Sequence, residues 1–515
     1  MKKTIKKLAA LLLAGALAAT AALPAMATSI KVDKPANAKT VHTYDVYQIF
    51  TGVVKEGKLT EIQYGENHPD FTTKDDATNY VPKTVLDGLT EANIRSYANG
   101  LELKGTAKSV TEGEGALTVD DGYYLLKDVS YTTSGKPDDS FSAIIVQVIN
   151  GDVTITPKRV SPTVDKEVLD DNVEGDRETK STDGWGETAD HEIGESFQFR
   201  LTAILPASAD YAQYPKYTVK FNDTMSTGVT FESIDSVYVD GVEITPGDNP
   251  ENYKCSAVAG QDGGPWTLTI DNLKAITGVD LSNGANVVVT YNAHLNANAT
   301  ITTASGSTIN ENKVSLTYSN NPDATGKGGT DTTEEDHVWV FTYGNTGTKT
   351  DATGEKLAGA GFQLHVGSST GTVVPLYKVG NEYYVYHSDK ADDYSDGESL
   401  ANRNPANEML TTDDGIFNIK GLDIGTYVLV ESTVPEGYVK AADTTVTITA
   451  THEEKADGTS YVNLGNSTVS ETIVNYTGTT LPSTGGMGTT IFYVIGGILV
   501  LAAAIILISR RRVQQ

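Results

Sequence analysis

The chain has 515 residues, of which 39 are Lys or Arg and 67 are Asp or Glu, and its formal net charge is −28. Because nucleic-acid binding needs positive patches that face the phosphates, this acidic balance excludes DNA and RNA as expected partners. The single cysteine, Cys255, has no partner for an intramolecular disulfide and no Cys-His motif around it, so we expect a buried, inert thiol.

Residues 1–27 are typical of a secretory signal peptide. A basic start with four lysines leads into an alanine-rich and leucine-rich run that ends in Ala25-Met26-Ala27. These are the basic region, apolar region and small-residue cleavage site of an export signal. A permanent membrane helix is the disfavoured alternative, because the apolar run is short and is followed by Pro24. We therefore expect the mature chain outside the cell.

Short runs of alternating apolar and polar residues dominate the mature chain. Residues 217–221 read YTVKF, 287–291 read VVVTY and 427–431 read YVLVE. This alternation predicts strands with one buried face, and the Gly, Asn and Asp residues between them predict turns. One short helix is expected near residues 85–98. The length fits about three domains, so the sequence predicts an all-β fold of tandem immunoglobulin-like β-sandwiches.

Two joints divide this β-rich region. Pro157 and Pro162 interrupt strand pairing at the first joint. Residues 321–336 are poor in apolar residues and rich in Gly, Thr and acids, which is typical of a linker. The expected domains, with the linker 321–336 between the last two, are residues 28–158, 159–320 and 337–477.

The C-terminal segment combines three parts in order. Residues 481–485 read LPSTG, and an apolar span at 489–509 and a basic tail at 510–515 follow. The span approaches the ~20 residues that cross a bilayer, and its trailing arginines favour a cytoplasmic tail. This order resembles the cell-wall sorting signal of sortase substrates, in which a sortase cysteine attacks the threonine carbonyl and an amine resolves the acyl-enzyme. The residues assigned to that signal are Leu481, Pro482, Thr484 and Gly485.

Three further stretches resemble the backbone pilins of Gram-positive bacteria. Residues 427–438, reading YVLVESTVPEGY, are similar to the E-box of that family. Residues 344–364 look like the opening strand of a Cna-B-type domain, and residues 473–479, reading IVNYTGT, look like its last strand. The resemblance implies an N-terminal pilin domain, a middle immunoglobulin-like domain and a C-terminal Cna-B-type domain.

In that family these stretches form a self-generated isopeptide bond, which the resemblance implies here for Lys349, Asn475 and Glu431. Burial disfavours the ammonium form of lysine and leaves a nucleophilic amine, while asparagine supplies an amide carbon. A buried glutamic acid can polarise the amide carbonyl and shuttle protons as ammonia leaves. The ordinary alternative is a surface lysine, a turn asparagine and a solvated glutamate.

The resemblance implies a second triad in the middle domain. Residues 162–168, reading PTVDKEV, resemble the opening of the family's second domain, and residues 310–321 resemble its closing strand. Lys166 and Asn312 fall at the reactive places. No E-box precedes this strand, so the acid is assigned to Asp223, which matches the aspartate of some family members.

The first segment supplies the expected polymerisation site. Residues 153–158, reading VTITPK, resemble the family's pilin motif with Thr156 in place of its tyrosine. The resemblance assigns Lys158 as the amine that accepts the Thr484 carbonyl of the next subunit, and the preceding proline favours its projection from the end of a sheet. A solvated lysine at a domain joint is the alternative. Arg159 stands where some members carry a reactive asparagine, so no cross-link is predicted in this domain.

Together these features predict the major structural subunit of a covalently polymerised, cell-wall-anchored pilus that supports adhesion. The implied partners are pilin-polymerising and housekeeping sortases, identical subunits, ancillary pilins, peptidoglycan and host surface ligands. No cofactor, metal ligand or turnover activity is assigned, because the candidate phosphate-loop and zinc-helix motifs lack key residues. The alternatives are a non-polymerised LPxTG-anchored adhesin or ancillary pilin, which needs no acceptor lysine, and a wall-bound enzyme, for which no convergent polar site is visible.

Overall fold

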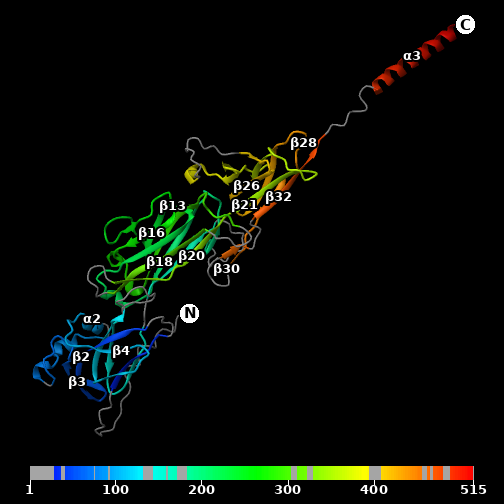
Figure 1. The fold of residues 1–515 in the computed structure, drawn as a ribbon. Coiled ribbons are helices and arrows are strands. Elements are labelled where there is room, and N and C mark those ends of the chain that lie inside the picture. The colour runs from blue at the N-terminus through cyan, green and yellow to red at the C-terminus, as the bar shows by residue number, and fades with distance from the viewer. Residues whose placement is uncertain are drawn as a thin grey trace.

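The computed structural model of the chain describes most of the mature region. Three β-rich domains follow one another along an elongated molecule (Figure 1). The predicted all-β fold of tandem β-sandwiches is confirmed. The signal peptide at 1–27 lies outside the described residues. The described ranges are 28–35, 41–74, 76–90, 93–130, 143–157, 161–170, 183–302, 310–321, 329–393, 407–454, 461–463, 468–478 and 488–513.

The first domain packs a three-stranded sheet against a five-stranded sheet, with alternate residues of both sheets in the core between them. Two short helices cover the outer face of the larger sheet, where one helix was expected. The first of them ends at Gly88, whose backbone N–H donates to the carbonyls of Val85 and Leu86. The elements are β1 (Thr28–Val32), β2 (Thr43–Lys55), β3 (Lys58–Tyr64), η1 (Ala77–Asn79), α1 (Lys83–Asp87), α2 (Ile94–Asn99), β4 (Lys108–Thr111), β5 (Leu117–Val119), β6 (Gly122–Asp128), β7 (Ala143–Val148) and β8 (Val153–Ile155).

The middle domain is built on a twelve-stranded sheet that folds over its own core. Its long strand β13 pairs with β18 through residues 219–225 and with β17 through residues 229–239, so one strand serves both layers. Gly228 lies at this change, where a Cβ atom would stand 2.5 Å from the Cα atom of Ala299. Only glycine allows that approach. The elements are β9 (Thr163–Leu169), β10 (Trp185–Gly186), β11 (Thr188–Asp190), β12 (Ser196–Leu205), η3 (Ala209–Gln213), β13 (Val219–Val239), β14 (Val242–Glu243), β15 (Tyr253–Cys255), β16 (Gln261–Ile270), η4 (Leu273–Ala275), η5 (Leu281–Asn283), β17 (Ala285–Leu295), β18 (Asn310–Asn321), β19 (Gly329–Thr332) and β20 (Asp336–Phe341).

Residues 321–336, which were expected to form a linker, contribute strands to this sheet. Strands β19 and β20 both pair with β18, so most of the described part of this segment belongs to the middle domain. A polar, threonine-rich sequence suits an edge strand as well as a linker, because Thr favours extended backbone and its hydroxyls pair across strands. The hydroxyls of Thr317 and Thr332 make such a contact at 2.9 Å.

The third domain is a sandwich of a six-stranded and a four-stranded sheet. Its first strand, β21, lies parallel to its last strand, β32, so the two ends of the domain are neighbours. The elements are β21 (Tyr343–Asp351), β22 (Gly361–Val366), β23 (Leu376–Val379), β24 (Glu382–Val385), η6 (Ser388–Asp393), β25 (Met409–Leu410), β26 (Ile416–Leu422), β27 (Gly425–Thr433), β28 (Tyr438–Val439), β29 (Thr444–Ile448), β30 (His452–Glu454), β31 (Tyr461–Asn463) and β32 (Thr468–Thr477).

The middle and third domains share strand β20. Val338 and Val340 pack into the core of the middle domain, while Trp339 and Phe341 pack into that of the third domain. Alternation along one strand therefore serves two cores, since successive side chains point to opposite faces.

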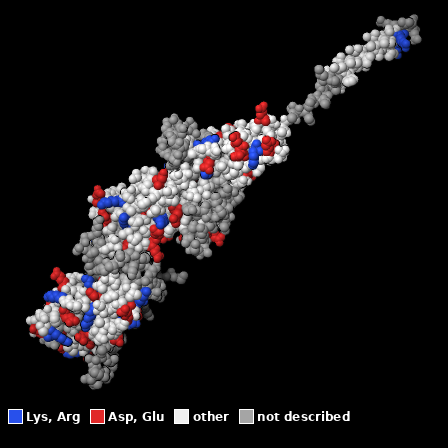
Figure 2. Space-filling view, viewed as in Figure 1, with Lys and Arg blue, Asp and Glu red and all other residues white. Residues whose placement is uncertain are grey.

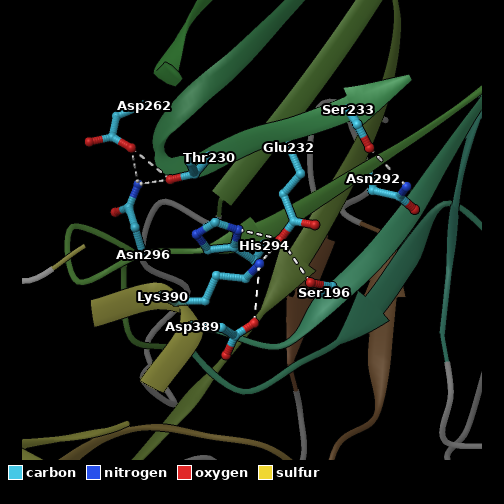
Figure 3. Close-up of polar contacts among 10 residues, drawn as sticks. All are labelled: Ser196, Thr230, Glu232, Ser233, Asp262, Asn292, His294, Asn296, Asp389 and Lys390. Carbon is cyan, nitrogen blue, oxygen red and sulfur yellow. Dashed lines mark hydrogen bonds and ion pairs between the residues drawn. The ribbon is translucent and has the colours of Figure 1, made fainter. Parts of the chain in front are cut away.

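Polar side chains reinforce this joint (Figure 3). Glu232 on β13 accepts hydrogen bonds from Ser196 at 2.8 Å and pairs with His294 at 2.6 Å. Lys390 from η6 of the third domain reaches the same carboxylate at 2.9 Å. A second pair, His387 with Glu192 at 2.8 Å, joins the same two domains.

Helix α3 (Gly488–Val513) lies beyond the third domain. Residues Thr490–Arg511 are long and apolar enough to cross a membrane, and an 18-residue stretch within them has a mean hydropathy of 2.9 and is not buried against the domains. On the face drawn in Figure 2, acidic and basic side chains are interspersed over the three domains, whereas the helix is uncharged until its C-terminal end.

Candidate functional site

The three residues predicted to react in the third domain lie in one buried region. Lys349 and Asn475 on the neighbouring strands β21 and β32, and Glu431 on β27 of the opposite sheet, are all at most 2% exposed. Asn475 donates a hydrogen bond from Nδ2 to Oε1 of Glu431 at 2.9 Å. The Lys349 amine donates to the carbonyl of Ile473 at 2.9 Å, two residues before Asn475 and on the same face of β32.

The environment of Lys349 favours an uncharged amine. Burial lowers the pKa of its ammonium group, and the nearby Glu431 and Asp351 carboxylates oppose that shift only in part. The other oxygen of Glu431 accepts from the backbone N–H of Ala441 at 2.6 Å, which fixes the carboxyl group. Glu431 therefore lies beside the amide nitrogen, the group that would leave as ammonia.

The middle domain gathers its predicted triad in the same manner. Lys166 on β9, Asp223 on β13 and Asn312 on β18 are all at most 1% exposed. The Lys166 amine pairs with Asp223 Oδ2 and donates to the Tyr291 hydroxyl at 3.2 Å. Asn312 donates from Nδ2 to that hydroxyl at 2.6 Å.

Burial shifts both ionisable partners of this site toward their neutral forms. It lowers the pKa of Lys166 and raises the pKa of Asp223, and in each case their mutual attraction opposes the shift. The rings of Phe199 and Tyr291 lie 5.2 and 5.5 Å from the Lys166 amine. A neutral amine beside a neutral carboxylic acid is the state from which attack on an amide can start.

The two sites share a further property. Within the described part of the chain, Oδ1 of Asn312 and Oδ1 of Asn475 are buried and have no hydrogen-bond partner. An unsatisfied buried acceptor costs about 1–3 kcal/mol, so neither amide is in a relaxed structural environment. Each asparagine belongs to a buried group that also contains a lysine and an acid, which is the composition that an amine-for-ammonia exchange requires.

The sequence did not single out Tyr291, whose hydroxyl contacts Lys166, Asp223 and the amide nitrogen of Asn312. Tyr291 occupies an inward position of an alternating strand, where an aromatic residue is indistinguishable from ordinary core. Nor did the sequence single out Asp336, whose carboxylate accepts from the backbone N–H of Lys166 at 2.6 Å and ties β9 to β20. Both contacts join segments more than 100 residues apart.

Several predicted residues cannot be placed. Lys158 lies outside the described residues, as do Leu481, Pro482, Thr484 and Gly485 of the sorting motif. Strand β8 ends at Ile155, and Pro157 beyond it is buried. Cys255 is half-buried, and burial raises the pKa of its thiol, which disfavours a reactive thiolate.

Two segments match known families. Residues 345–464 match the SpaA family, described as a prealbumin-like fold domain, and residues 473–515 match the LPXTG cell wall anchor motif. No curated protein matches the chain.

Solved structures of pilins are similar in fold. The T6 backbone pilin of serotype M6 Streptococcus pyogenes aligns with a TM-score of 0.52 and 16% identity over 88% of this chain and 98% of that one. The full-length major pilin SpaD from Corynebacterium diphtheriae aligns with a TM-score of 0.48 and 16% identity over 88% and 97%. The group B streptococcus pilus 2b backbone protein aligns with a TM-score of 0.40 and 22% identity over 62% and 99%.

The anchor motif and its apolar helix define a cell-wall-anchored protein of the Gram-positive type. Its mature region has a prealbumin-like SpaA domain within a fold similar to that of a Gram-positive backbone pilin.

Proposed function

We propose that this chain is the major structural subunit of a pilus that sortases polymerise covalently and attach to the cell wall. The observation that carries the proposal is a buried lysine grouped with an asparagine amide and a carboxyl group in each of two consecutive domains. In the third domain the lysine and the asparagine lie on the first and last strands, which a bond between them would connect. A shaft subunit needs such connections, because tension would otherwise separate those strands.

Each lysine amine attacks the asparagine Cγ atom, a new carbon–nitrogen bond forms, and the amide nitrogen leaves as ammonia. Each bond forms once, so the chain acts as its own substrate without turnover. By analogy with disulfides that close loops of ~100 residues, each bond adds about 4–5 kcal/mol of stability.

Polymerisation requires one acyl donor and one amine acceptor in every subunit. The sorting motif supplies the donor at Thr484, which matches the anchor family. We assign the acceptor to Lys158, which follows the buried Pro157 at the end of the first domain. Ancillary pilins and host surface ligands are further proposed partners.

The test is the state of the protein in cell-wall extracts boiled in detergent. Covalent polymers are expected as a ladder of high-mass bands that antibodies against this chain detect. A single band of monomer mass, released from the wall by peptidoglycan hydrolysis, would contradict the shaft role and favour a non-polymerised adhesin.

A further inference from the structure

We propose that the hydroxyl of Tyr291 is a catalytic proton relay for the middle-domain cross-link, carrying a proton between Asp223 and the departing amide nitrogen of Asn312. This inference rests on the proposed bond between Lys166 and Asn312. It comes from a difference between the two sites. In the third domain Glu431 contacts the amide nitrogen directly, but among the described residues no hydrogen bond joins Asp223 to Asn312.

The tyrosine hydroxyl fills that gap. It accepts from Asn312 Nδ2 at 2.6 Å and from the Lys166 amine at 3.2 Å, and it donates to Asp223 Oδ2 at 3.3 Å. One oxygen atom therefore contacts the nucleophile, the acid and the leaving group. A group in that position can serve both ends of the reaction.

Strand register explains why a relay is needed. On the ladder between β13 and β18, Asp223 lies opposite Val314, whereas Asn312 lies opposite Met225. The acid and the amide are thus diagonal neighbours on one face, with Cα atoms separated by about 7–8 Å. An aspartate side chain is one methylene shorter than that of Glu431, so the carboxyl group stops at the lysine.

Bonds and protons balance in the proposed reaction. The uncharged Lys166 amine attacks Cγ of Asn312, and the amide nitrogen gains a free lone pair as the carbon becomes tetrahedral. Tyr291 passes its proton to that nitrogen and takes one from Asp223, the carbon–nitrogen bond breaks, and ammonia leaves as the carbonyl re-forms. Asp223 then takes a proton from the lysine nitrogen, so the acid and the tyrosine end as they began.

The surroundings of Tyr291 suit this role. Its ring is enclosed by Phe199 at 5.2 Å, Phe231 at 5.7 Å and Trp266 at 5.0 Å between centroids. Burial keeps the pKa of the Tyr291 hydroxyl well above its ordinary value, so the relay proton is present at neutral pH. Because the ring is held by packing on three sides, Tyr291→Phe removes the hydroxyl and preserves the shape of the core.

The experiment follows both cross-links in the full chain. Newly synthesised chain is pulse-labelled, sampled over time and digested, and mass spectrometry quantifies the branched peptides that join Lys166 to Asn312 and Lys349 to Asn475. Tyr291→Phe is expected to slow formation of the first peptide by roughly 100-fold, the lower range for general acid–base catalysis. The second peptide forms at the wild-type rate and reports that the chain has folded.

Two further variants sharpen the test. Tyr217→Phe removes a hydroxyl from another buried tyrosine of the same core and is expected to change neither rate. Tyr291→Phe combined with Asp223→Glu lengthens the acid by one methylene, so the carboxyl group can reach the amide as Glu431 does, and part of the rate should return.

An unchanged rate in Tyr291→Phe overturns the relay, and so does a double variant that is as slow as the single one. If the wild-type chain contains no peptide joining Lys166 to Asn312, the proposed cross-link itself is overturned. The two failures are therefore distinguishable.

Discussion

Asn475 on β32 donates a hydrogen bond of 2.9 Å to Glu431 on β27, across the two sheets of the third domain. The Lys349 amine lies beside the same strand, against the Ile473 carbonyl. A digest of the mature chain is therefore expected to contain a branched peptide that joins Lys349 to Asn475, with the loss of one ammonia. Glu431→Ala should abolish this peptide, because Glu431 is the acid that contacts the amide nitrogen and would move protons there.

The matched control for that variant is Glu408→Ala. Glu408 is half-buried and binds the hydroxyls of Ser432 and Thr433, each at 2.6 Å. The branched peptide should persist in this variant. An unmodified mass for the wild-type peptides containing Lys349 and Asn475 would refute the assignment.

The middle-domain bond should depend on Lys166 and Asp223. Lys166→Ala is expected to remove the branched peptide that ends at Asn312 and to destabilise the domain by about 4–5 kcal/mol on the loop-closure analogy. Lys313→Ala, which removes a half-buried neighbour paired with Glu335 at 2.9 Å, is the control and should leave the peptide intact. A bond that forms normally in Asp223→Ala would show that the acid is misassigned.

Polymerisation should depend on Lys158. Lys158→Ala is expected to remove the high-mass ladder from cell-wall extracts, while monomer still reaches the wall through Thr484, because anchoring uses only the acyl donor. Lys31→Ala is the matched control, since Lys31 is exposed on β1 beside β8. A ladder that survives Lys158→Ala would move the acceptor to another amine.

The joint between the middle and third domains should weaken in acid. Burial raises the pKa of the Glu232 carboxyl group. Hydrogen bonds from His294, Lys390 and Ser196 outweigh burial and together lower this pKa to about 2 from an ordinary value of 4.5. A lowered carboxyl pKa contributes stability above its unfolded-state value, and that contribution is lost as the pH falls from about 4.5 through about 2. We expect the denaturation midpoint of the two-domain region to fall across this window.

Lys390→Ala should reduce the stability of the two-domain region at neutral pH by about 1 kcal/mol. It should also make the loss of stability in acid less steep. Chemical denaturation near neutral pH and at about pH 3 measures both. Lys313→Ala, which breaks a more exposed pair within the middle domain, should change neither by a comparable amount. Equal acid sensitivity in wild type and Lys390→Ala would exclude a contribution of this ion pair.

The middle domain should lengthen under tension even when its cross-link is intact. Asn312 lies opposite Val338 on β20, and β20 leads directly into the third domain. Residues 313–337, between these two positions, therefore lie outside the loop that the cross-link closes, but they carry the force from the middle domain to the third domain. In the third domain, by contrast, Asn475 is two residues from the end of β32.

Stretching the chain between attachment points at residues 158 and 478 should give a single increase in chain extension of roughly 80–90 Å, which is the extended length of residues 313–337. Lys166→Ala should give a much longer extension, because the whole middle domain then unravels. If the cross-linked chain shows no step before rupture, the β18–β20 pairing withstands the load and the prediction is wrong.

The sequence alone was sufficient for the elements that depend on local pattern. Alternation predicted the strands, the LPSTG motif with its apolar span predicted the anchor, and the E-box predicted the glutamate now found beside Asn475. These features succeed because period-two burial and motif order are written in neighbouring residues. The linker prediction failed where composition suits two structures equally, since a threonine-rich, acidic stretch can be a coil or an edge strand.

Only the tertiary structure decided which inward-facing residues meet. Tyr291 lies 125 residues from Lys166 in the chain, and its hydroxyl reaches that amine because β17 and β9 both pair with β12 in a fixed register. The position of Glu431 at the amide nitrogen likewise depends on how two sheets face each other. Strand register and sheet packing arise from many contacts between distant segments, so a pattern of neighbouring residues can name the reactive groups but cannot fix the distances between them.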